Sequence, residues 1–240
     1  MTVRMDRSGP IATVTIDRPD AGNKLDVATV DALSTTLAEL QEGGDPADVV
    51  ILAGAGDDFS LGREPAGSGP PTPSALITEF SRIQRLNELV QRYPAVTIAK
   101  VQGRARGAAL SLSGRCDFVL VAEGASLSFP EVHHGIPPTI VLSHYRYVLS
   151  RPVLFDLILT GREIDGVEAV ALGIATRAVA AAELEDVVSA LAEEVAGHGS
   201  RTLRTIKRFM AASDGMDPRD APTLGISMIT NEMVDRSLHR

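Results

Sequence analysis

The chain has 240 residues, a length that fits one α/β domain with a small C-terminal extension. Its formal net charge of -8 and its pI near 5.1 argue against nucleic acid or an anionic membrane surface as a partner. The single cysteine, Cys116, excludes an intrachain disulfide, and no stretch of 18 uncharged apolar residues is present, so we expect a cytoplasmic protein with no membrane partner.

Strand and helix patterns alternate along the first half of the chain. Residues 11–16 alternate aliphatic residues with threonine and predict a strand, and a helix is predicted from an N-cap at Asp26 to a stop at Gly43-Gly44. Residues 64–74 are rich in proline and glycine and predict a surface loop without helix or sheet, which could cover a site. The other elements expected here are strands at 49–53 and 96–101, a helix at 76–93, a turn at 103–107 and a helix start at 108–114.

The second half continues the alternation and ends in helices. The expected elements are strands at 116–122, 126–129 and 174–179, a loop at 130–138, helices at 139–160, 165–172, 183–196 and 201–212, and a helical tail. The helix at 139–160 contains Pro152, where it can break. Repeated strand–loop–helix units predict an α/β fold with a mainly parallel sheet, in which ligands bind at the carboxyl ends of the strands.

Two glycine-containing segments follow predicted strands and offer backbone N–H groups. Residues 54–64 read Gly-Ala-Gly-Asp-Asp-Phe-Ser-Leu-Gly-Arg-Glu, and glycine permits the dihedral angles that turn amides into a crevice, although glycine loops after strands are common. Residues 103–111 open a helix, whose N-terminal amides suit a developing oxyanion. Ala108 and Ser111 share one face of this helix and can both face a substrate; close packing of small residues is the alternative.

A third segment, residues 130–138, places one carboxylate in a loop. Glu131 stands between the apolar residues Phe129 and Val132. Partial burial would raise the pKa of its carboxyl group and suit it for proton transfer, whereas a solvated glutamate is the alternative.

Two other chemistries find less support in the sequence. A hydrolytic triad of Ser111, His133 and Asp117 is conceivable because triads are defined by geometry, but the Gly-x-Ser-x-Gly elbow is absent. A metal site at His133 and His134 lacks further ligands at a recognisable spacing, so we expect no metal.

Four segments stand in a characteristic order along the chain. They are Asp-Arg-Pro-Asp-Ala-Gly-Asn-Lys-Leu at 17–25, Gly-x-Gly-x-x-Phe-Ser-x-Gly-x-acid at 54–64, the glycine-led turn at 103–107, and Phe-Pro-Glu-x-x-x-Gly-Ile-Pro-Pro at 129–138. In these segments, and in Leu-Thr-Gly-Arg at 159–162 with Ala-x-x-x-Gly at 169–173, the chain resembles the enoyl-CoA hydratase/isomerase (crotonase) superfamily. The resemblance implies a crotonase-like ββα spiral over residues 1–198. It also implies a helical region at 199–240 through which subunits form a homotrimer or hexamer.

The resemblance further implies an enzyme that acts on an acyl-CoA thioester through an enolate, with no cofactor beyond the coenzyme A of the substrate. The two oxyanion-binding N–H groups fall on Arg63 and Ala108, the loop glutamate of the family falls on Glu131, and its helix glutamate falls on Ser111. The coenzyme A contacts fall on Ala21, Lys24, Leu25, Ala55, Leu61 and Gly62.

The Ser111 and Glu131 pair looks most like that of hydroxycinnamoyl-CoA hydratase-lyases, which hydrate an enoyl-CoA and then release an aldehyde. Hydratase (lyase) chemistry is therefore the first expectation. Those enzymes also carry a late tyrosine, which puts the aldehyde-releasing half in doubt, because the tyrosines here are Tyr93, Tyr145 and Tyr147. The alternatives are an enoyl-CoA isomerase with a single glutamate and an acyl-CoA binder without activity.

Two further expectations concern specificity and the C-terminal region. By the family layout, residues 76–80 and 140–144 would line the acyl group. A basic stripe on the helix at 201–212 could approach the adenine end of coenzyme A or form a solvated face; its members are Arg201, Arg204, Lys207 and Arg208.

Overall fold

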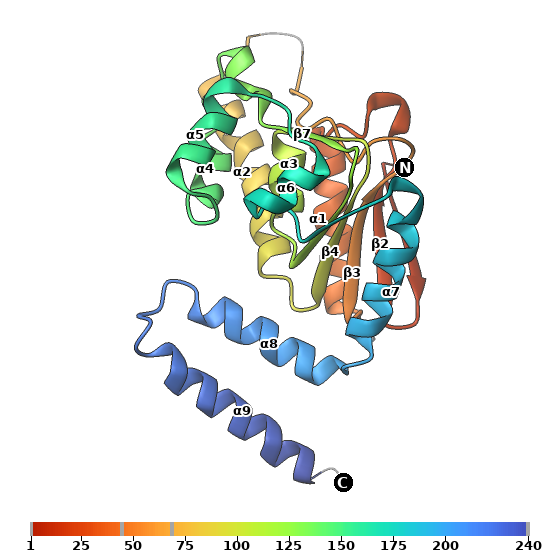
Figure 1. Ribbon diagram of the computed structural model, residues 1–240, viewed down its shortest axis with the longest axis vertical. Helices are drawn as coiled ribbons and strands as arrows, with labels where there is room; N and C mark the ends of the chain where they lie inside the picture. The colour runs from red at the N-terminus through yellow and green to blue at the C-terminus, as the bar shows by residue number, and fades with distance from the viewer. Residues whose placement is uncertain (1, 44–45, 68–69, 239–240) are drawn as a thin grey trace.

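The computed structural model describes residues 2–43, 46–67 and 70–238, and a six-stranded sheet forms its centre (Figure 1). In order across the sheet the strands are β1 (Val3–Ser8), β2 (Ile11–Ile16), β3 (Val49–Gly54), β4 (Val96–Val101), β6 (Phe118–Ala122) and β8 (Arg177–Val179). Among these strands, β1 and β2 pair antiparallel and all other neighbours pair in parallel. A small second sheet pairs β5 (Arg104–Arg106) with β7 (Ser126–Ser128) in parallel. The predicted α/β fold with a mainly parallel sheet is confirmed.

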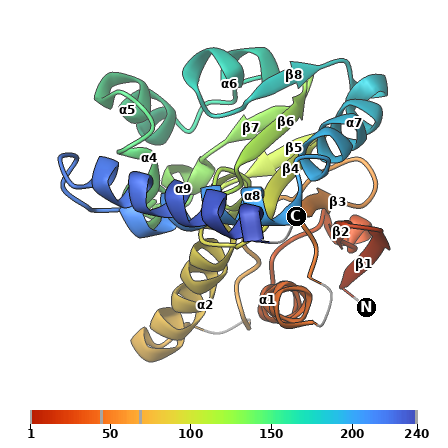
Figure 2. The same cartoon turned by 90° about the horizontal axis from the view of Figure 1, so that it is seen from below.

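Helices cover both faces of the sheet. Figure 1 and Figure 2 place α1 (Val27–Glu42) and α7 (Leu184–Ala196) on opposite faces, and α2 (Pro73–Gln91) packs against α1 and α3 (Ala108–Ser113). The other helices are α4 (Thr139–Tyr145), α5 (Arg151–Thr160), α6 (Gly166–Leu172), α8 (Ser200–Ser213) and α9 (Ala221–Leu238). Single turns of 3-10 helix form η1 (Pro19–Ala21), η2 (Pro130–His134) and η3 (Ala181–Glu183).

The predicted boundaries of α1 agree with the structure. The Asp26 side chain accepts a hydrogen bond from Thr29 N–H and caps the helix, and α1 ends at Gly43, while Gly44 lies outside the described residues. In Figure 1 the C-terminal pair α8 and α9 lies at one end of the sheet, where α8 contacts β4, and α8 begins directly after Gly199. The expected division between a core at 1–198 and a helical region at 199–240 therefore falls directly before α8. The role of the C-terminal region in oligomerisation stays a prediction.

Two predictions for the region after β7 are corrected. The helix expected at 139–160 is two helices, and the break at residues 146–150 precedes Pro152. Pro152 lies in the first turn of α5. N–H groups in a first turn have no partner within the helix, so the proline removes no helical hydrogen bond there. The segment expected as a loop at 130–138 contains the 3-10 helix η2, and Pro130 lies in its first turn as Pro152 does in α5.

Three other elements also differ from the prediction. β1 was not expected because five of its six residues are exposed and show no apolar pattern. β5 lies within the expected turn at 103–107, because it pairs with the distant β7. α2 begins at Pro73, inside the expected loop at 64–74, because the Thr72 side chain caps it; residues 68 and 69 of that loop lie outside the described residues. No helix within the described residues combines the length and apolarity needed to cross a membrane.

Candidate active site

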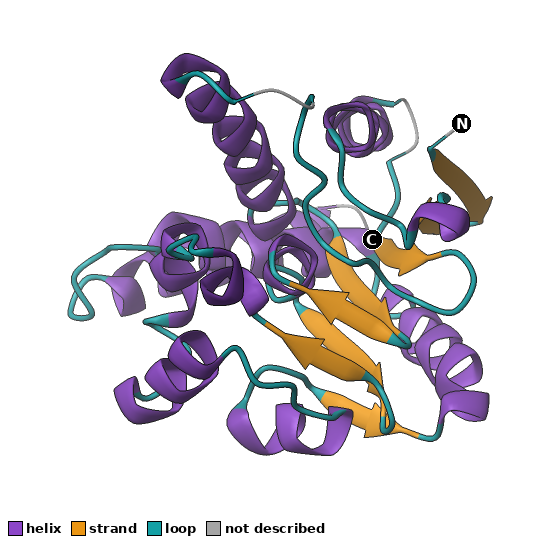
Figure 3. Ribbon diagram, turned by 90° about the horizontal axis from the view of Figure 1, so that it is seen from above, coloured by secondary structure: helices purple, strands orange, loops and turns teal. Residues whose placement is uncertain are grey.

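The loops that leave β3 and β4 meet above the carboxyl edge of the sheet, and Figure 3 views the molecule from that side. Ser60, from the loop after β3, pairs with Ala105 of β5 in a parallel bridge. Its N–H donates to the Arg104 carbonyl at 3.1 Å, and its carbonyl accepts from Arg106 N–H at 3.1 Å. These two bonds fix the register of the loops against each other.

Asn23 joins the segment at 17–25 to the same loop. It is fully buried, and its side-chain amide donates to the carbonyl oxygens of Ala55 and Asp58, each at 2.8 Å. Its side-chain oxygen accepts from Arg18 N–H at 2.9 Å. Asn23 has a positive φ of 52°, a conformation that asparagine tolerates better than most residues. The segment at 17–25 therefore holds the loop after β3 in place.

Two backbone N–H groups are left free where the loops meet. Among the described residues, neither Arg63 N–H nor Ala108 N–H has a hydrogen-bond partner. Gly62 brings them together: a Cβ atom added to it would lie 3.7 Å from the Ala108 nitrogen and 2.6 Å from the Arg106 carbonyl oxygen. Ala108 is the first residue of α3, where a helix has unpaired N–H groups. The pair can donate two hydrogen bonds to one oxyanion.

Glu131 lies beside these groups. A Cβ atom added to Gly107 would stand 2.7 Å from Glu131 Oε1, so the carboxyl group packs against the residue that precedes Ala108. Burial raises the pKa of Glu131, and its Oε2 is buried with no hydrogen-bond partner among the described residues. A carboxyl group with a raised pKa and a free oxygen can exchange a proton with a substrate.

Ser111 lies one helical turn after Gly107. Its N–H donates to the Gly107 carbonyl at 2.9 Å, its side chain is 1% exposed, and its Oγ has no partner among the described residues. A buried hydroxyl without a partner is costly unless a ligand or water satisfies it. The structure thus places Arg63, Ala108, Ser111 and Glu131 around Gly62 and Gly107.

A pocket of about 540 Å³ adjoins the segment at 17–25 and the loop after β3. Four of the residues predicted to contact coenzyme A line it: Ala21, Lys24, Ala55 and Leu61. The other two do not. Leu25 is 2% exposed and bonds through its N–H to the Gly62 carbonyl at 2.8 Å, so both residues hold the loop instead.

Arg104 also lines this pocket and was not predicted. Its guanidinium binds the Asp58 carboxylate at 2.6 Å, and this bond lowers the pKa of Asp58. The only signal in the sequence was the pair of arginines in the turn at 103–107.

The side chain of Arg63 makes contacts that the sequence did not reveal. Its guanidinium forms an ion pair with Glu79 of α2 and lies 5.0 Å from the ring centroid of Phe80. Both charged side chains are largely buried, at 18% and 11% exposed. Glu79 and Phe80 belong to the segment expected to line the acyl group. Since Arg63 also carries a free N–H, the ion pair ties that N–H to α2.

Removal of this ion pair should lower turnover. We expect Glu79→Gln to reduce kcat about 10-fold with little change in KM, because a charge-assisted bond that positions Arg63 contributes roughly 1.5–3 kcal/mol. Steady-state kinetics would measure this. The matched control is Asp31→Asn, which removes the exposed 3.4 Å ion pair between α1 and Arg82 of α2 and should leave kcat unchanged. Equal kinetics in the two variants would refute the positioning role.

The hydrolytic triad is contradicted. The Asp117 carboxylate binds Lys207 Nζ at 2.6 Å and Thr97 N–H at 2.8 Å. His133 packs against Gly161, where an added Cβ atom would lie 2.4 Å from its Nε2. Ser111 has no histidine within hydrogen-bonding distance among the described residues.

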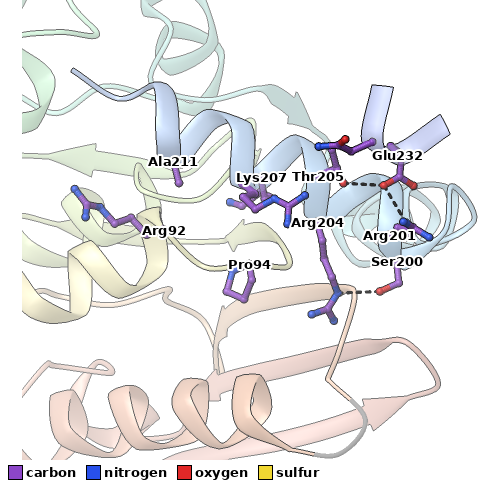
Figure 4. A pocket seen from close by; sticks show the side chains of 11 residues that line it. Arg92, Pro94, Ser200, Arg201, Arg204, Thr205, Lys207, Ala211 and Glu232 are labelled. Atoms are coloured by element: carbon purple, nitrogen blue, oxygen red, sulfur yellow. Dashed lines mark hydrogen bonds and ion pairs between the residues drawn. The ribbon is translucent and has the colours of Figure 1, made fainter. Parts of the chain in front are cut away.

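The basic stripe on α8 faces a second pocket, of about 650 Å³, beside the start of β4 and therefore at the opposite edge of the sheet (Figure 4). Most of its charges are used within the chain. Arg201 pairs with Glu232 at 3.0 Å, Arg204 bonds to Ser200 at 2.9 Å, and Lys207 pairs with Asp117. The stripe therefore serves to join α8 to α9 and to the sheet.

Comparison with known proteins identifies the family of this chain. The family model described as enoyl-CoA hydratase/isomerase matches residues 6–230. A Thermus thermophilus protein named as a candidate enoyl-CoA hydratase is 31% identical over 216 residues, which cover 88% of this chain and 85% of that protein. Carnitinyl-CoA dehydratase of Salmonella paratyphi A is 27% identical over 227 residues, covering 90% of this chain and 82% of that protein.

Solved structures show the same fold. The enoyl-CoA hydratase of Mycobacterium smegmatis superposes with a TM-score of 0.93 at 24% identity, over 98% of this chain and 92% of that one. The enoyl-CoA hydratase of Bacillus anthracis superposes with a TM-score of 0.89 at 25% identity, over 96% and 90%. The crotonase fold expected from the sequence is thereby confirmed, and the chain belongs to the enoyl-CoA hydratase/isomerase family.

Proposed function

We propose that this protein hydrates a 2-enoyl-CoA thioester through an enolate that the N–H groups of Arg63 and Ala108 stabilise. The observation that carries the proposal is the convergence of two unpaired N–H groups, the Glu131 carboxyl group and the unpaired Ser111 hydroxyl around Gly107. Donors aimed at a developing oxyanion commonly contribute about 3–4 kcal/mol each to lowering the barrier, so this is the expected main term.

In the proposed reaction the two N–H groups bind the thioester oxygen and draw electron density from the C2=C3 double bond. Ser111 Oγ orients a water molecule, whose oxygen bonds to C3 while its proton passes to Glu131. Glu131 then returns a proton to C2 of the enolate, so the net change is the addition of one water. The raised pKa of Glu131 suits it to both halves of this exchange.

Coenzyme A is the proposed ligand of the pocket beside Lys24 and Arg104. Lys24 carries the positive charge that a phosphate requires, and Arg104 on the same wall holds its charge beside Asp58. No cofactor beyond the substrate enters the proposed reaction.

An isomerase is the second candidate, because Glu131 is the one carboxylate that the described part of the chain places against Gly107, the residue before Ala108. It would remove a proton from C2 of a 3-enoyl-CoA and return it to C4. Release of an aldehyde after hydration has less support. Tyr93 and Tyr145 are buried, and their hydroxyls donate to the carbonyls of Leu37 and Leu110.

Assembly into a homotrimer or hexamer is proposed with the C-terminal helices as the contact region. Large apolar side chains are exposed on both helices, which is typical of a surface that is covered in an assembly. They are Ile206, Met210, Ile226, Ile229 and Met233.

The reaction type can be tested directly by mass spectrometry. The protein would be incubated in deuterated water with crotonyl-CoA, a 3-enoyl-CoA and feruloyl-CoA. Addition of one water to crotonyl-CoA is the expected result, and release of an aldehyde from feruloyl-CoA would extend it to lyase chemistry. Migration of the double bond without added water would replace the hydratase with the isomerase. Binding of all three without turnover would favour an acyl-CoA binder.

Ser111 separates the two candidate reactions. We expect Ser111→Ala to lower the kcat of hydration about 10-fold, because one hydrogen bond that orients water is lost, and to leave isomerisation nearly unchanged. Ser113→Ala is the control, since Ser113 Oγ lies on the same helix but donates to the Leu110 carbonyl at 2.9 Å. Unchanged hydration in Ser111→Ala would remove Ser111 from the proposal.

A further inference from the structure

The pocket beside the start of β4 is basic, although the chain as a whole carries a net charge of -8. Its volume of about 650 Å³ is that of a site for a small organic molecule. Among the described residues that line it, one carboxylate, that of Glu232, stands against five cationic side chains, which are Arg92, Arg201, Arg204, Lys207 and Arg208. A concave surface with an excess of one charge concentrates ligands of the opposite charge, so this pocket favours anions.

The carboxylates at this pocket are already engaged and do not repel an anion with free charge. Glu232 Oε2 accepts hydrogen bonds from Arg201 Nε at 3.0 Å and from Thr205 Oγ1 at 3.1 Å. Asp117, behind the pocket, accepts from Lys207 Nζ with both of its oxygens at 2.6 Å. These pairs account for two of the five cations.

Two arginines of the pocket have no counter-ion. Arg92 and Arg208 are exposed, and neither side chain forms an ion pair or hydrogen bond within the described part of the chain. Arg204 is weakly paired, since its guanidinium lies 3.7 Å from the Asp48 carboxylate. A guanidinium group can donate two parallel hydrogen bonds to one phosphate, so unpaired arginines in one pocket suit a phosphate dianion.

The other walls of the pocket indicate what the phosphate would be attached to. Arg92 and Pro94 lie across the pocket from α8, and Ser200, Thr205 and Asn231 add neutral polar groups to its walls (Figure 4). The pocket exceeds the size of a phosphate ion, so it has room for an organic group with hydroxyls that these side chains can bind. No aromatic ring is found among its described lining residues, so a nucleotide base would have no ring on which to stack.

The pocket is distinct from the two surfaces already assigned. It has no described lining residue in common with the pocket beside Lys24, and it lies at the opposite edge of the sheet. Along α8, at about 100° per residue, Ile206 and Met210 fall on a different face from Arg204 and Arg208. The exposed apolar side chains of the proposed assembly surface therefore do not line it.

We propose that this pocket binds a small hydroxylated organic phosphate of the class of phosphorylated sugars and polyols. The phosphate accepts hydrogen bonds from the unpaired guanidinium groups of Arg92 and Arg208, and the hydroxyls face Ser200 and Asn231. The proposal concerns a second ligand of the protein and does not rest on the proposed reaction.

The test is isothermal calorimetry with ribose 5-phosphate, glycerol 3-phosphate and glucose 6-phosphate, each compared with the unphosphorylated sugar or polyol. We expect a Kd below about 1 mM for at least one phosphate and no heat from its unphosphorylated counterpart. Arg92→Gln and Arg208→Gln should each weaken binding at least about 10-fold, the usual effect of losing hydrogen bonds to a charged group. Arg85→Gln, which replaces an exposed arginine outside the pocket, is the matched control and should bind as the natural protein does.

Two further measurements separate this pocket from the proposed coenzyme A site. Lys24→Gln should retain the binding of the sugar phosphate, and loss of binding in this variant would place the ligand in the other pocket and overturn the proposal. Adenosine 3′,5′-bisphosphate should bind less tightly than the sugar phosphate. The reverse order, with loss in Arg208→Gln, would make the pocket a site for the adenine end of coenzyme A and would also overturn it.

The remaining outcomes are equally decisive. Failure of all three phosphates to bind would overturn the proposal, as would binding that survives unchanged in both Arg92→Gln and Arg208→Gln. Both arginines are exposed and unpaired, so the variants should keep the melting temperature of the natural protein, and a loss of binding then reports on the pocket.

Discussion

Glu131→Gln should lower kcat by about 10²- to 10⁴-fold and leave the Kd of a saturated acyl-CoA nearly unchanged. General acid–base catalysis contributes an effect of this size, and glutamine keeps the shape of the side chain without its proton exchange. Glu131 is the group to which the proposed reaction gives both proton transfers, and its buried Oε2 has no hydrogen-bond partner among the described residues. Steady-state kinetics and calorimetry would measure the two quantities. Glu123→Gln, an exposed glutamate before β7, is the matched control.

The same substitution should raise the melting temperature at neutral pH. Burial raises the pKa of Glu131 above its ordinary value, so the folded protein prefers the protonated carboxyl group. The stability that this provides is present at low pH and is lost as the pH rises through the raised pKa. Glutamine removes the buried charge and with it that loss. A melting temperature that falls in Glu131→Gln would show that the ionised carboxylate supports the fold and would contradict the proposed environment.

Gly62→Ala should lower kcat by about 10²- to 10³-fold, the usual cost of losing one oxyanion donor. Gly62 has a φ of +84°, and an added Cβ atom would lie 2.6 Å from the Arg106 carbonyl oxygen. The two loops must therefore separate, which moves Arg63 N–H away from Ala108 N–H. A displacement near 1 Å is enough to cost about 10²-fold in rate.

Gly173→Ala is the matched control for this prediction. Gly173 has a φ of +82°, and an added Cβ atom would meet nothing within 4 Å. The two variants thus carry similar backbone strain, and only one of them disturbs the site. Kinetics on a 2-enoyl-CoA with circular dichroism melts would compare them. Equal losses of kcat would mean that strain, and not the position of the N–H groups, explains the effect.

The elements that carry the site were predictable because their signals are local. The aliphatic run at 49–53, the glycines at 54–62 and the turn before Ala108 each show in a short stretch of sequence, and the structure places them at one edge of a parallel sheet. The resemblance in four ordered segments then gave Arg63, Ala108, Ser111 and Glu131 their expected roles.

The contacts that were missed join residues far apart in the chain. Glu79 meets Arg63 across 16 residues, and Gln91 meets Arg115 across 24. Neither pairing has a periodic or compositional signal, because it depends on how α2 is laid beside α3. The break at 146–150 was misplaced for a different reason. A proline inside a helical pattern predicts a break at that residue, whereas Pro152 lies in the first turn of the following helix.

The measurement that tests the central claim most directly is the carbonyl stretching frequency of a bound 2-enoyl-CoA labelled with ¹³C at the thioester carbon. Difference infrared spectroscopy on the natural protein should show the stretch at lower frequency than in solution, since two N–H groups polarise the carbonyl. The shift should persist in Gly173→Ala and shrink in Gly62→Ala. A carbonyl frequency that matches free substrate, with the thioester fully bound, would contradict the claim that Arg63 and Ala108 hold the reacting oxygen.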